Sequence, residues 1–169
     1  MTLRIALVVL LCAMLAVLES VVPFLLHLRA SRPDLLLVVV LYLALHDDVV
    51  QGSALSAVAG YFSDLTSATP PFLYTFLAVL TFLVLRVAGS ALKTEGGPQS
   101  AAVAFGASLV HSLIATAAFG FFTGAGFHFQ LSPSLWSAFG TALAAPLVFL
   151  LLRGLDANFL HTEESGGLR

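Results

Sequence analysis

The stretch RPDLLLVVVLYLALHDD, residues 32–48, encloses an unbroken apolar run between charged residues. The apolar run has 11 residues. A helix of that length spans about 16 Å, whereas the hydrocarbon core of a bilayer is about 30 Å thick. Pro33 and Asp34 favour a helix start, because proline suits the first helical position and an acid in the first turn complements the helix dipole. The stretch therefore predicts a short helix over about 35–45.

The composition indicates an integral membrane protein. Of the 169 residues, 59% are hydrophobic and 9% are charged, which is far more apolar surface than one soluble core of this size could bury. The Lys and Arg residues, 7 in number, are scattered over the chain and form no basic patch, and the net charge is -2. We therefore expect the lipid bilayer as the surroundings of this chain and no nucleic-acid partner.

Polar residues divide the chain into six apolar segments, most of them close to the length of about 20 residues that crosses a bilayer as a helix. The predicted helices cover about residues 5–26, 35–45, 49–62, 71–91, 101–122 and 133–152. They form a polytopic membrane domain over residues 1–153, which is followed by a polar cytoplasmic tail over residues 154–169. The sequence thus predicts an all-α integral membrane protein with six transmembrane helices, of which the second and third are short.

The two short segments are either full spans or a re-entrant hairpin. In a hairpin, Asp47 and Asp48 would lie near mid-membrane at a cost of at least ~2.5 kcal/mol each, with mutual repulsion in addition. Short full spans joined by a wet turn are therefore favoured. Both arrangements return the chain to the same side, so the placement of the later helices is the same in each.

The distribution of Lys and Arg predicts that both termini are cytoplasmic. Most of the basic residues then lie inside, as the positive-inside rule expects: Arg4, Arg86, Lys93, Arg153 and Arg169. Arg29 and Arg32 stand on the outer face, where the rule expects few positive charges. We hypothesise that an acidic group holds them there, either Asp34 or an acid of a partner protein.

Small residues recur at every fourth position in the third segment, at Gly52, Ser56 and Gly60, and the series ends on Asp64. Residues four apart share one face of a helix, and small side chains let another helix approach closely in lipid. The face is either an intramolecular packing surface or a contact surface for a partner. Asp64 stands at the end of this helix, where the dipole disfavours a negative charge. A specific partner is therefore expected for it, with the two arginines of the outer face as candidates.

Glu19 lies about 21 Å along the first predicted helix, within the outer third of the bilayer. Acids inside a membrane are candidates for function, whereas an acid this close to the interface can also reach the lipid headgroups. The sequence leaves both interpretations open.

Enzymatic and metal-binding interpretations find little support in the sequence. Ser108 and His111 are similar to the nucleophile and base of intramembrane serine proteases. However, Leu109 stands where that family has glycine, and the base of that family comes from a separate helix. The 5 histidines lie in different segments without ligand spacing. We expect no catalytic residue, no cofactor and no metal.

The order of motifs from Arg29 to about Arg86 resembles the family of the rod shape-determining protein MreD. These motifs are the Arg32-Pro33-Asp34 start, the short apolar run, the helix with Gly52, the segment from Gly60 to Asp64, and a Thr/Ser/Pro turn that leads to Phe72-Leu73-Tyr74. The chain departs from that family at Pro71, where glycine is frequent, and at Asp47 and Asp48, in a loop that is often basic.

The resemblance implies a non-enzymatic subunit of the bacterial cell-elongation machinery in the cytoplasmic membrane. It implies binding to the single-span protein MreC and, through MreC, an association with the MreB filament, the peptidoglycan polymerase RodA and the elongation transpeptidase. The implied fold is similar to the substrate-binding subunits of energy-coupling-factor transporters. The residues that we expect to contact or orient MreC are Glu19, Arg29, Arg32, Pro33, Asp34, Gly52, Ser56, Gly60 and Asp64.

The same similarity of fold raises an alternative function, a vitamin-binding membrane subunit of an energy-coupling-factor transporter. Such a subunit needs a polar and aromatic pocket near the outer face, for which the candidates are Tyr74, His128, Gln130 and Trp136. A small channel or transporter in its own right is a third alternative, but the sequence offers few inward polar residues for a conduction path.

Overall fold

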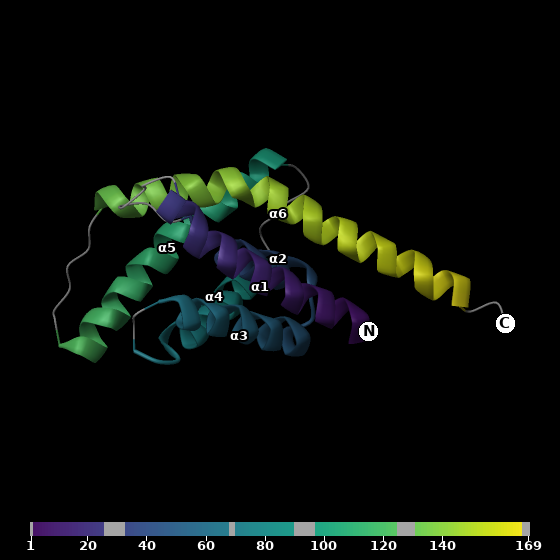
Figure 1. Cartoon of the computed structure of the whole chain (residues 1–169), viewed down its shortest axis with the longest axis horizontal. Coiled ribbons are helices and arrows are strands. Elements are labelled where there is room, and N and C mark those ends of the chain that lie inside the picture. Colours follow the sequence, from purple (N-terminus) through teal and green to yellow (C-terminus); the bar gives the residue numbers. More distant parts are fainter. Residues whose placement is uncertain (1, 26–32, 68–69, 90–96, 125–130, 167–169) are drawn as a thin grey trace.

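The computed structural model describes residues 2–25, 33–67, 70–89, 97–124 and 131–166. For residues 2, 22–25, 97 and 158–166 it describes the backbone, which is helical, but not the side chains. The described residues form the helices α1 (Thr2–Leu25), α2 (Leu35–His46), α3 (Val49–Thr66), α4 (Leu73–Gly89), α5 (Gly97–Thr123) and α6 (Leu131–Gly166) (Figure 1). α1, α5 and α6 each contain an apolar stretch long enough to cross a membrane, and α2 and α4 are shorter apolar helices. The chain is therefore an all-helical, multi-pass membrane protein.

α2 is the central helix of the bundle and contacts each of the other helices, α1, α3, α4, α5 and α6. Every residue from Leu36 to Ala44 is buried. A helix at a surface shows an apolar stripe, whereas a sequence that is apolar at nearly every position suits a helix with neighbours all round. α2 has 12 residues and is therefore about 18 Å long. The prediction of a short second helix is confirmed.

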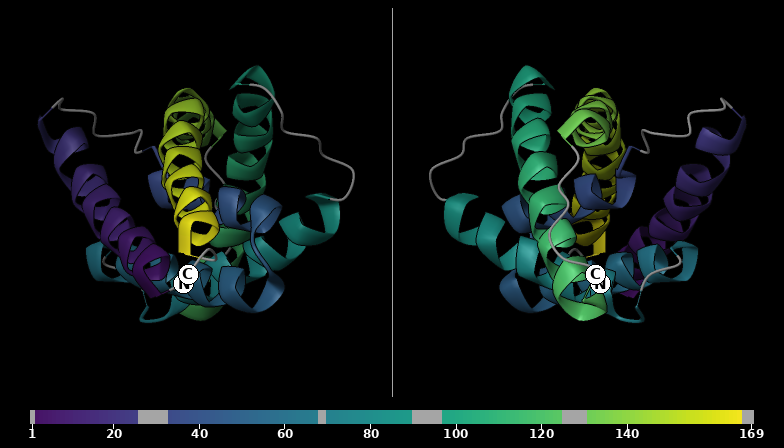
Figure 2. Two further views of the ribbon diagram at one scale, coloured as in Figure 1. Left: turned by 90° about the vertical axis from the view of Figure 1, so that its right-hand side faces the viewer. Right: turned by 90° about the vertical axis from the view of Figure 1, so that its left-hand side faces the viewer.

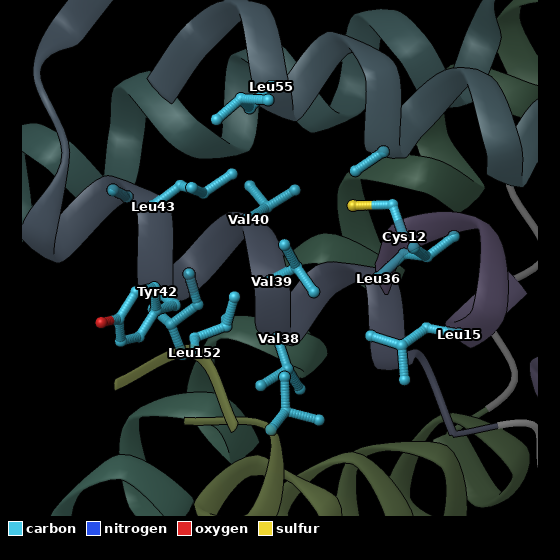
Figure 3. Close-up of a cluster of buried hydrophobic side chains, with 14 of the residues drawn as sticks. Cys12, Leu15, Leu36, Val38, Val39, Val40, Tyr42, Leu43, Leu55 and Leu152 are labelled. Carbon is cyan, nitrogen blue, oxygen red and sulfur yellow. The ribbon is translucent and has the colours of Figure 1, made fainter. Parts of the chain in front are cut away.

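The core around α2 is built from side chains of several helices (Figure 3). Cys12 and Leu15 of α1 lie near the start of α2, Leu55 of α3 lies over its middle, and Leu152 of α6 lies beside Tyr42. Lipid is as apolar as these side chains, so the exclusion of water does not favour their contacts over contacts with lipid. Close packing therefore holds this part of the bundle together.

α3 packs against α4 through the small residues of its repeat. A Cβ atom on Gly52 would lie 2.5 Å from the ring of Phe82, and a Cβ atom on Gly60 would lie 2.6 Å from the Cα atom of Thr75. Ser56, between the two glycines, has no exposed surface. Within the chain, this face therefore serves as the packing surface between α3 and α4.

α6 is longer than the sequence predicts. The predicted helix ends at residue 152 and a polar tail follows, whereas α6 has 36 residues and continues to Gly166. Leu155 packs against the core, and Asp156 is hydrogen-bonded to α1 and α2, so tertiary contacts hold the first turn beyond the predicted end. α3 likewise has 18 residues and continues to Thr66 instead of ending at residue 62, so the prediction of a short third helix is wrong.

The figures show how α6 lies relative to its neighbours. In Figure 1 its C-terminal part, drawn in yellow, extends beyond the other helices. In Figure 2, which looks along the longest axis of the molecule, α1 and the first half of α5 lie on opposite sides of α6. α6 therefore connects the two outer helices of the bundle, and it also contacts α2 between them.

We expect Gly60→Ala to destabilise the protein, because the added Cβ atom would meet backbone atoms of α4 that cannot move without shifting that helix. Overpacking of this kind costs about 1–3 kcal/mol. Thermal unfolding of the purified protein in detergent should show a midpoint several degrees lower. Gly154→Ala is the matched control, since nothing lies within 4 Å of a Cβ atom at that position. Equal midpoints for the two variants would contradict the close approach of α3 and α4.

Candidate functional site

Polar side chains gather at both ends of α2. At its C-terminal end, Arg4 of α1 donates hydrogen bonds to Asp47, 2.5 Å away, and to Asp156 of α6, 2.7 Å away. The hydroxyl of Tyr42 donates to the second carboxylate oxygen of Asp156 at 2.6 Å. We call these four residues the Arg4 cluster. They join α1, α6 and the end of α2.

The Arg4 cluster corrects one prediction. The sequence predicts that Asp47 lies in a wet turn, but this residue is only 5% exposed and its charge is compensated by Arg4. A buried carboxylate is tolerated when an opposite charge pairs with it. Asp48, the next residue, is exposed and precedes α3 without a side-chain capping bond. Of the two acids in this turn, Asp48 is therefore the one that is accessible from outside the bundle.

A second group of polar residues lies at the N-terminal end of α2. Oδ1 of Asp34 accepts a hydrogen bond from the amide of Leu37 at 2.8 Å and so caps the helix, and the amide of Asp34 donates to Oγ1 of Thr141 at 2.9 Å. Oδ2 of Asp34 lies 3.7 Å from Nε2 of His111. Nδ1 of His111 lies 3.1 Å from the hydroxyl of Thr81. The group thus connects the start of α2 with α4, α5 and α6.

A cavity of about 210 Å³ opens beside Asp34 and His111, and we call it the polar cavity. It is lined by Glu19, Ser20, Asp34, Ser63, Thr66, Ser67, Tyr74, Ser108, His111, Ser112, Ala115 and Ser137. All of these side chains except that of Ala115 are polar. Inside a membrane bundle such a lining is costly unless its groups find partners, and ionisable residues at such a position are candidates for function. The polar cavity is therefore the candidate functional site.

The structure brings some of the predicted site residues together. Glu19 and Asp34, from α1 and the start of α2, both line the polar cavity. Pro33 packs against α6, where it lies close to the backbone at Gly140. Arg29 and Arg32, which the sequence also predicts as site residues, lie outside the described residues.

Asp64 caps the start of α4. Its carboxylate accepts hydrogen bonds from the amide of Tyr74 at 2.8 Å, the amide of Thr75 at 3.0 Å and the hydroxyl of Thr75 at 2.6 Å. The first amides of a helix have no partner within the helix, and the positive end of the helix dipole attracts a negative charge. Asp64 therefore has a specific partner, which is the N-terminus of α4, whereas the two arginines that the sequence offers as its candidates lie outside the described residues.

The remaining predicted residues are those of the small-residue face. Gly52 and Gly60 contact α4, and Ser56 is buried between them. A partner helix could reach this face directly only by displacing α4. The role of these residues in binding a partner stays a prediction. In the described arrangement they would affect such a partner through the position of α4.

The sequence does not predict the residues that surround the predicted acids. Thr81 and Thr141 are ordinary polar residues of apolar helices, and no local pattern marks them. His111 carries a usable signal, because an ionisable residue within an apolar helix is a candidate for function. Arg4 and Asp156 are separated by 152 positions, so no local pattern predicts their contact.

An apolar groove lies between α4 and α5, and we call it the α4–α5 groove. It has a volume of about 440 Å³ and is lined by Thr81, Val84, Leu85, Ala88, Ala102, Val103, Gly106, Ala107, Val110 and Ile114. A Cβ atom on Gly106 would meet nothing within 4 Å. Small residues on an open apolar surface are the features with which helices associate in membranes.

These observations define a multi-pass helical membrane protein with a polar cavity inside the bundle and an apolar groove on its side. Among the residues that the structure describes, no three His, Cys, Asp or Glu side chains are arranged to hold a metal ion. The chain belongs to the MreD family, because the family model of the rod shape-determining protein MreD matches residues 1–155. This family consists of non-catalytic, shape-determining membrane proteins, so membership implies a role in rod shape determination.

The family match confirms the resemblance that the sequence suggests. The motifs that carry the resemblance end at about Arg86, whereas the match includes α5 and most of α6 as well. Comparisons with curated proteins and with solved structures gave no match.

We expect Arg4→Gln to cost about 3–5 kcal/mol of stability, because it leaves the buried carboxylate of Asp47 without its opposite charge. Asp47→Asn in the same chain should recover part of this loss, since it removes the unpaired charge. Thermal unfolding of both single variants and the double variant in detergent forms a double-mutant cycle. Strictly additive losses would show that the two residues do not interact.

Proposed function

We propose that the protein is a non-enzymatic membrane subunit of the bacterial cell-elongation complex. It binds MreC and helps to determine rod shape by organising peptidoglycan synthesis. Through MreC it associates with the MreB filament, RodA and the elongation transpeptidase. The observation that carries this proposal is the MreD family match, which covers residues 1–155 of a chain of 169 residues.

The proposed orientation in the cytoplasmic membrane has six spans and both termini in the cytoplasm. The Arg4 cluster supports it, because Arg4 near the N-terminus and Asp156 near the end of α6 are bonded to each other at one end of the bundle. Charged residues are tolerated best near a membrane boundary. With the Arg4 cluster at the inner boundary, the polar cavity at the opposite end of α2 faces the outer side.

The surface that we propose for the membrane span of MreC is the α4–α5 groove. A single helix gains most in lipid where small residues allow close approach, and Ala88, Ala102 and Gly106 supply such positions. We further propose that a set of residues contacts or orients MreC, either directly or through the placement of α4: Glu19, Arg29, Arg32, Pro33, Asp34, Gly52, Ser56, Gly60 and Asp64.

The polar cavity is the observation that favours the alternative, a vitamin-binding subunit with the fold of energy-coupling-factor transporters. Of the residues expected for such a pocket, Tyr74 lines the cavity. Trp136 is 64% exposed and is not among the lining residues, and His128 and Gln130 lie outside the described residues. The volume of about 210 Å³ is also below the range of about 300–1,000 Å³ that is usual for drug-sized ligands.

A pull-down of the tagged full-length protein from its native membrane, in a mild detergent, distinguishes the two functions. We expect recovery of MreC together with RodA and the elongation transpeptidase. An untagged strain treated in the same way is the control. Recovery of an ATPase-bearing transporter module in place of MreC would overturn the proposal in favour of the vitamin-binding subunit.

Gly106→Leu tests the α4–α5 groove as the contact surface for MreC. The leucine side chain would fill the groove without meeting other atoms at its Cβ, so the thermal unfolding midpoint should stay the same. The yield of co-purified MreC should fall about tenfold or more, which corresponds to about 1.4 kcal/mol. Gly154→Leu, at another open position, is the matched control and should leave the yield unchanged. A normal yield with Gly106→Leu would place the contact elsewhere.

A further inference from the structure

The polar cavity has a chemical character that binding to another helix does not require. Besides the carboxylates of Glu19 and Asp34, its lining has seven Ser and Thr hydroxyls, and no Lys or Arg is among the lining residues that the structure describes. Carboxylates accept hydrogen bonds and carry negative charge, and hydroxyls accept as well as donate. Such a lining suits a ligand that is positively charged and that donates several hydrogen bonds.

Two atoms in the wall of the cavity are held in place but have no hydrogen bond within the described part of the chain. They are Oδ2 of Asp34 and Nε2 of His111, whose separation of 3.7 Å exceeds a hydrogen bond. The other carboxylate oxygen is bonded to the amide of Leu37, and the other ring nitrogen is bonded to Thr81, so both groups are fixed in orientation. His111 is only 8% exposed. A donor placed in the cavity beside both atoms would satisfy both, with the imidazole proton on Nδ1.

The arrangement favours an ammonium group over a metal ion. A calcium ion needs six to eight oxygen ligands at about 2.3–2.6 Å, and no three acidic, His or Cys side chains of the described residues converge in that way. A primary ammonium has three N–H donors and needs acceptors at ordinary hydrogen-bond distances. The cavity, at about 210 Å³, has room for such a group and for ordered water beside it.

We propose that the polar cavity binds a primary ammonium group. The ammonium donates hydrogen bonds to Asp34, to His111 and to the hydroxyls of the wall, while Asp34 and Glu19 supply the negative charge that faces it. The same chemistry is present in a free small amine and in the headgroup of an aminophospholipid. The site is distinct from the α4–α5 groove and can be tested on the isolated full-length chain, so its failure would leave the proposed binding of MreC untouched.

Two probes distinguish the sources of the ammonium group. The first is ethanolamine, added to the purified full-length protein in detergent while thermal unfolding is followed, with ethylene glycol as an uncharged control of similar size. The second is a nanodisc with phosphatidylethanolamine or with phosphatidylcholine, whose quaternary ammonium has no N–H donor, followed by native mass spectrometry of the lipid that the protein retains. A free-amine site predicts an unfolding midpoint raised by ethanolamine alone. A headgroup site predicts preferential retention of phosphatidylethanolamine.

Variants show whether either effect comes from the polar cavity. Asp34→Asn removes the charge but keeps a good helix cap, because Asn caps helices as well as Asp does. This variant and Glu19→Gln should weaken binding at least tenfold. Asp48→Asn removes an exposed acid outside the cavity and should leave binding unchanged. The proposal is overturned if neither probe binds preferentially, or if binding is the same in wild type, Asp34→Asn and Glu19→Gln.

Discussion

α2 is apolar along most of its length and has neighbours on all sides, and the unpaired backbone groups at its two ends need hydrogen-bond partners from the protein. Asp34 does this at the N-terminal end by accepting the amide of Leu37. At the C-terminal end, Arg86 donates to the carbonyl of Ala44 at 3.1 Å, and Arg4 compensates the charge of the buried Asp47. The start of α2 is thus capped by its own Asp34, which is in turn bonded to Thr141 of α6, and the end of α2 is bonded by Arg86 of α4 and paired with Arg4 of α1. These contacts fix how α1, α4 and α6 lie around the helix.

The position of α4 follows from a second constraint, its close contact with α3. The absence of side chains at Gly52 and Gly60 allows the approach, and Asp64 holds the start of α4 through three hydrogen bonds, two from amides and one from the hydroxyl of Thr75. α4 in turn supplies Tyr74 to the polar cavity and one wall of the α4–α5 groove. The residues of the small-residue face thus shape both candidate sites without lining the groove themselves.

One residue connects the two sites. Thr81 lines the α4–α5 groove, and its hydroxyl bonds to His111, which lies on α5 and lines the polar cavity. Any shift between α4 and α5 would change the environment of that imidazole. One ring nitrogen of His111 is bonded to Thr81 of α4, and the other lies near Asp34. In a family whose members determine cell shape without catalysis, the described geometry thus links a surface suited to a helix with a cavity suited to a small polar group.

The sequence by itself determined the membrane class, the order of helices, the short central helix and the family. Composition, segment length and the motifs around Asp34 and Asp64 can be seen in the sequence itself. The first two determine directly whether a segment can cross a bilayer as a helix. Only the tertiary structure decided what the charged residues contact. Asp64 meets the start of α4, Asp47 meets Arg4, and Asp156 meets both Arg4 and Tyr42. Such contacts join residues on different helices, and a helix pattern specifies which face a residue lies on but not which helix will pack against that face.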